Sequence, residues 1–481
     1  MSVLIRIPSL DRPLALHHEW GTAHILITLQ IWEEYGISTY NYNPVFTFEN
    51  AGDKYPTDLG RIGDEDGNYY YTSYPPFTFY FPFLVFKLLG IYPDVLPIQI
   101  LHLVLHFISA ILIYFIVCNI CSKPIGNKLF FPALLSSCLY IFLPNNLWYL
   151  CNVFSVEIFS QTLFLVALFA TSYVLKDTYP NRKRNLILLI TVFLLAFTEY
   201  IGFLFLIPLL FIIYRSQTKD STRLISGLII GGFSAFLFCI FIYSNICGVQ
   251  CLVDNLIDRY HFRSGTTENS ELQLTYFNLS SYSRIFTSYT WEYSRVFLMY
   301  FLALVATYIF IFKKSSLTEL SRLEKNILVL SWVPVILHHL ILFGFTAVQS
   351  FAVCKTSIPI IITIGILSNK LINVLTRKLK MVSLLITIIL IPLLVFHFYK
   401  VNFRDYVNPG YKEIGVQIAK NNKSDELVFV TGYDAEFLIC PQTNFYARRN
   451  VAYCKDINDA ESKLKSFNID KGVIFEINEN R

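Results

Sequence analysis

Long apolar runs separated by short basic links constrain this chain more than any other feature of its sequence. Runs long enough, or nearly long enough, to cross a hydrocarbon core of about 30 Å occupy residues 97–119, 129–146, 149–175, 224–246, 288–312, 326–346, 349–368 and 381–399. Two shorter runs between residues 185 and 214 are interrupted at Thr198–Tyr200, which predicts a pair of helices that meet near one membrane surface. The pattern predicts an α-helical polytopic membrane protein with about ten transmembrane helices.

Composition supports the membrane class and excludes others. Hydrophobic residues make up 54% of the 481 positions and charged residues only 15%, with a mean hydropathy of +0.50. Soluble domains are far less apolar. The formal net charge of +5 comes largely from Lys and Arg in the links between apolar runs, where such residues report topology. Because no basic patch is interleaved with aromatic residues, nucleic acid is not an expected partner.

The distribution of Lys and Arg predicts the sidedness of the spans. The five basic links face the cytoplasm by the positive-inside rule, and they lie near residues 123–128, 176–184, 215–223, 313–325 and 370–380. The alternate segments are longer and richer in Asp, Tyr and Asn, and they are therefore expected outside. We expect a multi-pass protein of a cytoplasmic (inner) membrane with its site on the extracytoplasmic side.

The polar parts of the chain divide it into three predicted domains. Residues 1–96 form a first extracytoplasmic loop with surface helices, and residues 97–400 form the transmembrane helical bundle with an outer loop at 247–287. Helix and strand patterns alternate in residues 401–481, which predicts a small extracytoplasmic α/β domain. That domain has no Gly-rich phosphate loop, so a nucleotide site is not expected there.

The first of these domains contains two short apolar segments and an unusual start. Residues 77–89 are broken by Pro82 and carry Lys87, so they are interpreted as a surface-lying or re-entrant helix, and residues 20–35 are interpreted in the same way. The opening MSVLIR is neither a signal peptide nor a span. We therefore expect that a first transmembrane helix is missing or that the start site is displaced, with a naturally translocated tail as the alternative.

Four cysteines are expected on the outer side. Cys247 with Cys251, and Cys440 with Cys454, would face an oxidising compartment and are candidates for disulfides. Free thiols are the alternative for each pair.

Ionisable residues inside the predicted spans gather in the outer halves of those spans. Such residues are costly in hydrocarbon and usually face a cavity or a partner. Histidines that satisfy each other in the core are the alternative for any single position, but a common depth favours an outward-facing polar cavity. The residues are His102, His106, Glu157, Glu199, His338, His339 and Lys355.

Two motifs in residues 11–90 carry a family resemblance. An acidic residue precedes a predicted helix in HEWGTAHILITLQIWEEYG, and a Pro-Pro segment precedes a short apolar helix in SYPPFTFYFPFLVFKLLG. With these motifs and the C-terminal ICPQTNFYARRNV, the chain resembles the GT-C class of membrane glycosyltransferases related to aminoarabinose and protein O-mannosyl transferases. The resemblance implies a GT-C-like fold and a sugar taken from a polyprenyl-phosphate carrier. His18 stands where the class usually has Asp, and the first helix of the class is absent.

The resemblance and the chemistry together assign candidate roles. Displacement at the anomeric carbon needs a base at the acceptor hydroxyl and cations or donors at the departing phosphate. Glu19 matches the acidic position of the class and is the first candidate for the base, with Asp11 in reserve; the alternative for Glu19 is an exposed acid at a helix N-terminus. The candidates for the phosphate are Lys87, Lys355, His102 and His106, and those for sugar hydroxyls are Glu157 and Glu199.

A bound metal is a weaker expectation. His17, His18, Glu19 and His24 are close in sequence, but adjacent residues on a helix point in different directions, so no metal ligands are assigned. No cofactor is certain, and a divalent ion is left open.

The function favoured by the sequence is transfer of a sugar from a polyprenyl-phosphate donor to a glycan, lipid or protein acceptor. A transporter or flippase of lipid-linked glycans is one alternative, and it predicts polar residues throughout the membrane and repeat symmetry. A glycan polymerase or ligase is another, and it predicts an Arg-rich outer loop, whereas residues 247–287 contain only Arg259, Arg263 and Arg284.

Overall fold

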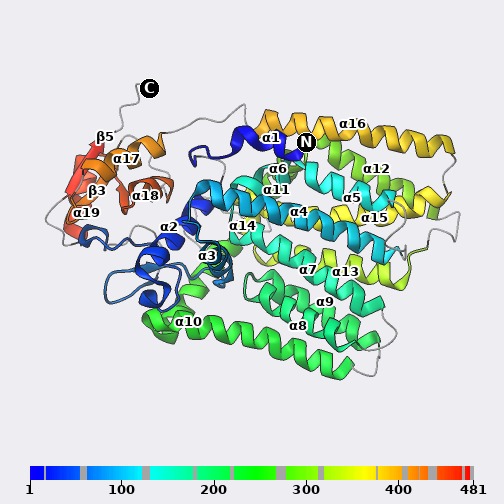
Figure 1. The fold of residues 1–481 in the computed structure, drawn as a ribbon, viewed down its shortest axis with the longest axis horizontal. Helices are drawn as coiled ribbons and strands as arrows, with labels where there is room; N and C mark the ends of the chain where they lie inside the picture. The colour runs from blue at the N-terminus through cyan, green and yellow to red at the C-terminus, as the bar shows by residue number, and fades with distance from the viewer. Residues whose placement is uncertain are drawn as a thin grey trace.

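The computed structural model places the polar segments of the chain at one end of a long bundle of helices (Figure 1). The residues that it describes are 1–15, 18–54, 62–121, 130–176, 181–216, 221–266, 278–312, 319–374, 377–402, 410–421, 423–431, 441–467 and 472–476.

The longest apolar helices form the body of the bundle. Among the described residues, four helices are long and apolar enough to cross a membrane, or five if a pair bent by 97° forms one span. The four are α4 (Val95–Ile120), α7 (Val156–Lys176), α10 (Ser221–Ser264) and the stretch Ser350–Ile372, which joins η5 (Ser350–Thr356) to α15 (Ser357–Val374). The expected total of about ten spans stays a prediction.

Shorter helices pack between and around these. They are α5 (Phe131–Phe142), α6 (Pro144–Asn152), α8 (Arg182–Ala196), α9 (Ile201–Ser216), α11 (Leu279–Tyr293), α12 (Arg295–Phe312), α13 (Arg322–Ile341), α14 (Phe343–Val348) and α16 (Arg377–Asn402). The helix pair predicted between residues 185 and 214 is confirmed as α8 and α9, which lie against α10 (Figure 1).

Three predicted spans are divided in the structure. Residues 129–146 are split at Leu143, because Pro144 lacks the N–H that would continue the helix and instead opens α6. The next span then begins at Val156 and not at residue 149. The run 288–312 is bent by 97° at Ser294, whose φ of +67° is left-handed, and the run 326–346 ends at Ile341 before α14.

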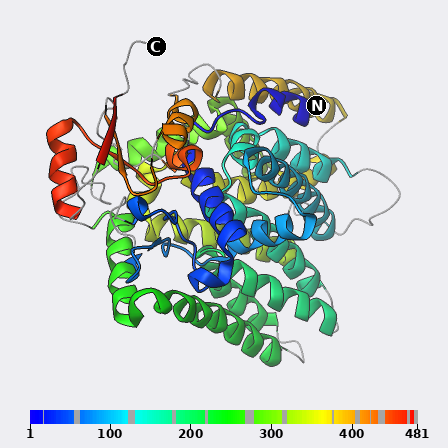
Figure 2. The same ribbon diagram turned by 60° about the vertical axis from the view of Figure 1, so that its left-hand side comes forward.

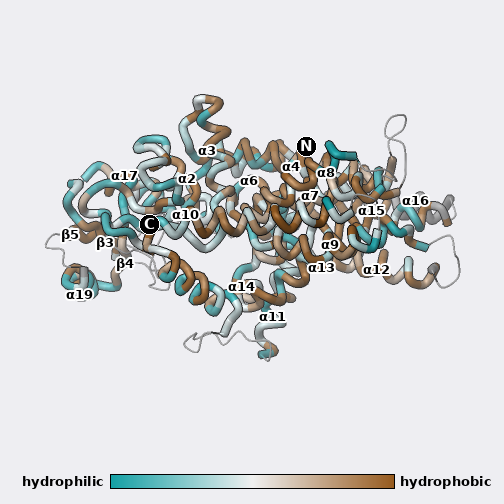
Figure 3. Tube along the Cα trace, turned by 90° about the horizontal axis from the view of Figure 1, so that it is seen from below, coloured by the Kyte–Doolittle hydropathy of each residue, from teal (hydrophilic) through white to brown (hydrophobic). Residues whose placement is uncertain are grey.

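The surface of the bundle is apolar where no helix covers it. Figure 3 shows hydrophobic residues along the length of the bundle and hydrophilic residues around its polar end. On α10, exposed fractions of 52–68% are found at Ile229, Ile230, Phe233 and Phe241. Large side chains exposed in a band of this kind indicate contact with lipid tails.

Two helices of the first domain differ in their burial. In α3 (Phe77–Leu89), Leu84 and Leu88 are exposed, which suits the predicted surface-lying helix. In α2 (Trp20–Tyr35), however, nearly every residue from Gly21 to Trp32 is buried. The prediction of a surface helix at 20–35 is therefore wrong, because α3 packs against one side of α2 and the C-terminal helix α18 (Pro441–Ala447) packs against another.

Short helices and two short strands make up the rest of the first domain. They are α1 (Ser2–Arg6), η1 (Ile7–Ser9), η2 (Ile37–Tyr40), η3 (Ala51–Asp53) and the antiparallel strands β1 (Ile62–Gly63) and β2 (Tyr69–Tyr70).

The C-terminal part contains a parallel three-stranded sheet with the order β4-β3-β5, as expected for an α/β unit. Its central strand is fully buried, which is usual for a parallel strand covered on both faces. Figure 2 shows this orange and red unit beside the blue N-terminal segment. Its other elements are α17 (Tyr411–Asn421), β3 (Leu427–Thr431), β4 (Val451–Tyr453), α19 (Ile457–Phe467) and β5 (Gly472–Glu476).

A buried ion pair attaches the C-terminal unit to the first polar segment. Arg449 Nε lies 2.9 Å from Asp53 Oδ1, and the backbone N–H of Asn450 donates to the same oxygen at 3.0 Å. Gly52 is required beside this pair, since a Cβ there would lie 2.4 Å from the carbonyl oxygen of Glu426. The two parts of the chain therefore meet without space for an added side chain.

One of the two predicted disulfides is confirmed. Cys247 and Cys251 are bonded where α10 kinks at Gly248. Cys440 lies outside the described residues, and Cys454 carries a free thiol whose sulfur lies 3.8 Å from the carbonyl oxygen of Val430.

Candidate active site

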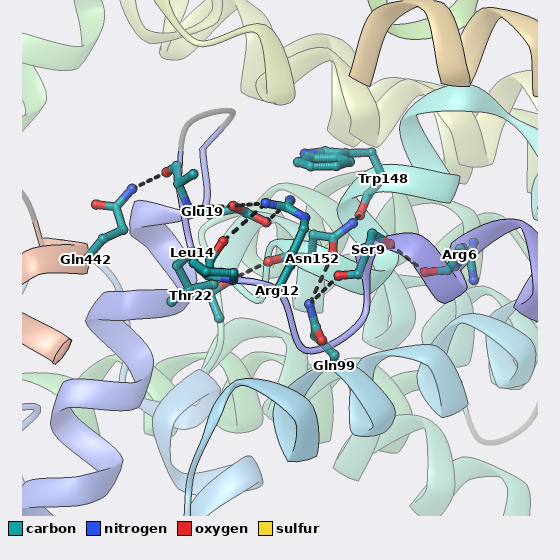
Figure 4. A network of polar contacts seen from close by, with 12 residues as sticks. Arg6, Ser9, Arg12, Leu14, Glu19, Thr22, Gln99, Trp148, Asn152 and Gln442 are labelled. Atoms are coloured by element: carbon teal, nitrogen blue, oxygen red, sulfur yellow. Dashed lines mark hydrogen bonds and ion pairs between the residues drawn. The ribbon is translucent and has the colours of Figure 1, made fainter. Parts of the chain in front are cut away.

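Glu19 lies at the polar end of the bundle, immediately before α2, and its side chain is 0% exposed. Its Oε2 accepts hydrogen bonds from Arg12 Nη1 at 3.1 Å and from the backbone N–H of Ala15 at 2.8 Å. Its Oε1 accepts a further hydrogen bond from Arg12 Nη2 (Figure 4). The alternative of an exposed acid at a helix end is thereby ruled out.

Burial changes the acidity of this carboxyl. It raises the pKa of Glu19 to about 7, although the positive charge of Arg12 and the N–H of Ala15 act in the opposite direction. Desolvation disfavours the charged form of an acid, and here its effect exceeds that of the ion pair. A carboxylate with a pKa near neutrality is suited to accept a proton at physiological pH.

Arg12 is the partner that sequence reasoning missed. Its guanidinium carbon lies 4.8 Å from the ring centroid of Trp148 on α6, and its side chain is 12% exposed. Glu19 follows it by seven residues, but residues 12–15 are not helical, so a helical period does not bring the two side chains together. The backbone is left-handed at Asp11, immediately before Arg12, and at His18, immediately before Glu19.

A hydrogen-bond network extends from this pair into the bundle (Figure 4). Gln99 of α4 donates to the carbonyl oxygen of Ser9 at 3.2 Å and to Asn152 Oδ1 at 3.1 Å. Thr22 of α2 donates to the carbonyl oxygen of Asn152 at 2.8 Å. Asp11 joins the network through its backbone N–H, which donates to Gln99 at 2.9 Å, while the residue itself is exposed.

His102 and His106 lie deeper in the bundle, beside the buried Arg6. Arg6 Nη2 is 2.6 Å from His106 Nδ1, and Arg6 Nε donates to the carbonyl oxygen of Leu147 at 3.0 Å. His102 packs edge-on to Phe154, and its two ring nitrogens have no hydrogen-bond partner among the residues that the structure describes.

A second ionic cluster joins three elements in the bundle. Glu199, between α8 and α9, places Oε1 2.9 Å from His338 Nε2 of α13 and 3.0 Å from Lys355 Nζ of η5. Ser160 of α7 donates to the other carboxylate oxygen at 3.2 Å. The structure thus brings two of the predicted substrate-binding residues, Glu199 and Lys355, into contact with each other.

The other two predicted substrate-binding residues, Glu157 and Lys87, lie in different places. Glu157 is buried in the first turn of α7, three residues before Ser160. Lys87 is exposed on α3 and lies 3.0 Å from Glu33 of α2. Lys87 therefore does not belong to the buried clusters with which the sequence analysis grouped it.

Glu292 is a buried carboxylate that the sequence did not predict as a site residue. Glu292, near the end of α11, accepts hydrogen bonds from Tyr149 at 2.8 Å and from Ser350 at 2.6 Å. Ser350 Oγ also lies 3.2 Å from His18 Nε2. Glu292 falls inside the predicted span 288–312, so its position among apolar residues was the signal that could have identified it.

Metal-ligand groups do not gather around these carboxylates. In the part of the chain that the structure describes, no three His, Cys, Asp or Glu side chains are arranged to hold a metal ion. His17, one member of the sequence cluster, lies outside that part.

Comparison with solved structures identifies the fold, whereas no family model and no curated protein matches the chain. ArnT from Cupriavidus metallidurans, bound to undecaprenyl phosphate, is 10% identical over 98% of this chain and 88% of its own, with a TM-score of 0.56. The oligosaccharyltransferase AglB from Archaeoglobus fulgidus, in complex with an inhibitory peptide and a dolichol-phosphate, is 11% identical over 95% of this chain, with a TM-score of 0.53. This chain spans 63% of the length of AglB. Both are GT-C proteins, so the predicted GT-C-like fold is confirmed.

Proposed function

We propose that this protein is a membrane glycosyltransferase that moves one sugar from a polyprenyl-phosphate donor to a hydroxyl of a glycan, lipid or protein acceptor. The observation that carries the proposal is Glu19, a buried carboxylate with a pKa raised to about 7, which immediately precedes α2. The shared fold supports it, because ArnT binds undecaprenyl phosphate and AglB binds a dolichol-phosphate with that fold.

The arrangement suits a single displacement. Glu19 accepts the proton of the acceptor hydroxyl, whose oxygen attacks the anomeric carbon while the polyprenyl phosphate departs. The apolar surface of the bundle suits the hydrocarbon tail of the donor, which stays in the bilayer while its phosphate reaches the polar end. His102, His106 and Lys355 remain proposals for contacts to the phosphate, and Glu157 and Glu199 for contacts to sugar hydroxyls.

Purified protein in nanodiscs, supplied with a panel of undecaprenyl- and dolichyl-phosphate sugars, tests this function. Glu19→Gln should lower kcat by about 10²–10⁴-fold, the usual contribution of a positioned base. Glu33→Gln is the matched control, since Glu33 is an acid of the same helix that bonds Lys87 instead. Equal rates in Glu19→Gln and the unmodified protein would remove Glu19 from the mechanism, and Asp11→Asn would be tested next.

We also propose that the polar end faces the extracytoplasmic side of a cytoplasmic membrane. An impermeant maleimide applied to intact cells should label Tyr42→Cys, at the polar end, and not Arg182→Cys, at the start of α8 on a basic link; both positions are exposed. The reverse labelling would place the site in the cytoplasm.

A further inference from the structure

The proposed reaction moves one negative charge from Glu19 to the donor phosphate. The acceptor O–H proton goes to the Glu19 carboxylate, and a bond forms between the acceptor oxygen and the anomeric carbon. The bond from that carbon to the phosphate oxygen breaks, and its electron pair stays on the oxygen. Glu19 thus becomes neutral, while the phosphate changes from a singly charged diester to a monoester that carries up to one further charge.

Arg12 is placed to pair first with the negative charge of Glu19 and then with that of the phosphate. It engages Glu19 through two nitrogens of its guanidinium, and the same fork geometry matches a phosphate. Its side chain is 12% exposed and lies over Trp148, whereas Glu19 beneath it is 0% exposed. An anion that approaches the pair from solvent or lipid therefore meets the guanidinium and not the carboxylate.

Three other buried cations contact groups other than the candidate base. Lys355 is 1% exposed and contacts both Glu199 and His338. Arg6 is buried and bonded to the carbonyl oxygen of Leu147, and Arg449 is bonded to Asp53. Of these four, only Arg12 both contacts the candidate base and retains an exposed surface.

We propose that Arg12 exchanges partners during the reaction: it pairs with Glu19 in the resting protein and passes to the phosphate of the lipid carrier as the proton reaches Glu19. This inference rests on the proposed function.

The energetics favour such an exchange. A buried carboxylate that loses its only cationic partner becomes a stronger base, because the charged form is then uncompensated. Departure of Arg12 therefore drives the proton onto Glu19, and the protonated Glu19 no longer attracts Arg12 back. In the same step the phosphate gains its additional negative charge and the guanidinium of Arg12. Neither Glu19 nor the phosphate is therefore left buried as an anion without a partner.

Binding of undecaprenyl phosphate, without any sugar, tests the exchange. Glu19→Gln removes the competitor for Arg12, so we expect it to bind undecaprenyl phosphate at least about tenfold more tightly, while transfer is lost. Arg12→Gln should bind at least about tenfold more weakly. Glu33→Gln is the control and should bind as the unmodified protein does. Unchanged or weaker binding in Glu19→Gln would overturn the proposal.

A double variant separates exchange from a general effect on structure. In Arg12→Gln, the further change Glu19→Gln should no longer tighten binding, because the tightening acts through Arg12. If Arg12→Gln does not fold, Arg12→Lys is used in its place; it keeps the charge without the fork, and the tightening should shrink. If Glu19→Gln tightens the binding of undecaprenyl phosphate by the full amount in the Arg12→Gln or the Arg12→Lys protein, the exchange is contradicted.

This assay distinguishes the inference from the proposed function. Tightening in Glu19→Gln without transfer from any donor would support partner exchange and reject the glycosyltransferase. Transfer by the unmodified protein without tightening in Glu19→Gln would support the glycosyltransferase and reject the exchange.

Discussion

Glu19 and Glu199 are both fully buried carboxylates, but they are held in different ways. Glu199 is joined to His338 and Lys355, which come from two other elements, and all three side chains are almost completely buried. Among the residues that the structure describes, Glu19 has one cationic partner, Arg12, which lies seven residues away on the same segment and is partly exposed.

The difference shows which cluster holds the bundle together and which is available for chemistry. The Glu199 cluster connects the α8–α9 turn to α13 and η5, so a change there disturbs the packing of several helices. The Glu19 pair itself connects two positions of one segment, and Arg12 also lies over the ring of Trp148 on α6.

Lys355→Met should have the largest effect on stability. It leaves buried Glu199 with His338 and the hydroxyl of Ser160 but without its lysine, and breaking such a buried ion pair typically costs about 3–5 kcal/mol in the free energy of unfolding. This loss in the free energy of unfolding is measured by denaturing the purified protein in nanodiscs. A loss below about 1 kcal/mol would mean that the cluster is not structural, and would favour the predicted role of Lys355 in substrate contact.

Asp53→Asn should reduce the stability of the C-terminal unit by about 1.5–3 kcal/mol, the usual contribution of hydrogen bonds to a charged group. Asp53 accepts from both Arg449 and Asn450. Hydrogen exchange of α18 and β4 measures this effect, and faster exchange confined to these elements is expected. Unchanged exchange there would show that the unit is held by other contacts.

The rate of transfer should rise with pH and level off above about 7. Glu19 must be deprotonated to act as a base, and its pKa is raised to about 7 by burial. Below that value we expect kcat/KM to fall about tenfold per pH unit, and this dependence should be absent from the residual activity of Glu19→Gln. A profile that levels off near pH 4.5 would indicate an exposed carboxyl as the base.

The raised pKa of Glu19 also predicts that its contribution to the stability of the folded protein decreases as pH rises. Because the pKa of Glu19 is higher in the folded protein than in the unfolded one, the stability it contributes is fully present below about 4.5 and is lost as pH rises through about 7. Between pH 5 and 8, the Tm of the unmodified protein should therefore fall relative to that of Glu19→Gln. A constant difference in Tm would contradict the raised pKa.

Lys87→Gln should have the smallest effect. Lys87 is exposed and its ion pair with Glu33 is of the kind that contributes about 0–1 kcal/mol. Transfer and binding of undecaprenyl phosphate should both match the unmodified protein. A large loss of either would return Lys87 to the site, as the sequence analysis predicted.

Much of the fold was predictable because hydrophobic length is a local property. The runs that became α4, α10 and α16 were identified from composition alone, and so was the break between α8 and α9. The bend at Ser294 was not, since no Gly or Pro marks it. The burial of α2 was not predictable either, because the helix that covers it, α18, follows it by more than four hundred residues.

The site was predicted in part for a similar reason. Glu19 was identified because it matches the acidic position of the GT-C class, but its pairing with Arg12 was not, and the left-handed backbone at Asp11 and His18 carries no distinct sequence signal. Glu199 and Lys355 were identified by their depth in the membrane. Their mutual pairing was not, because sequence gives the depth of a residue in a span without the rotation of that span about its axis.

The contact between the two ends of the chain also bears on how the protein is made. Gln442 donates a hydrogen bond to the carbonyl oxygen of Ala15 across 427 positions, and the hydroxyl of Tyr446 accepts one from the backbone N–H of Leu14. These partners lie more than four hundred positions apart, so the segment that carries Arg12 and Glu19 gains the contacts of α18 only after residues 441–447 have been synthesised. Folding around Glu19 is therefore completed late, after the helices between these two parts of the chain have been made.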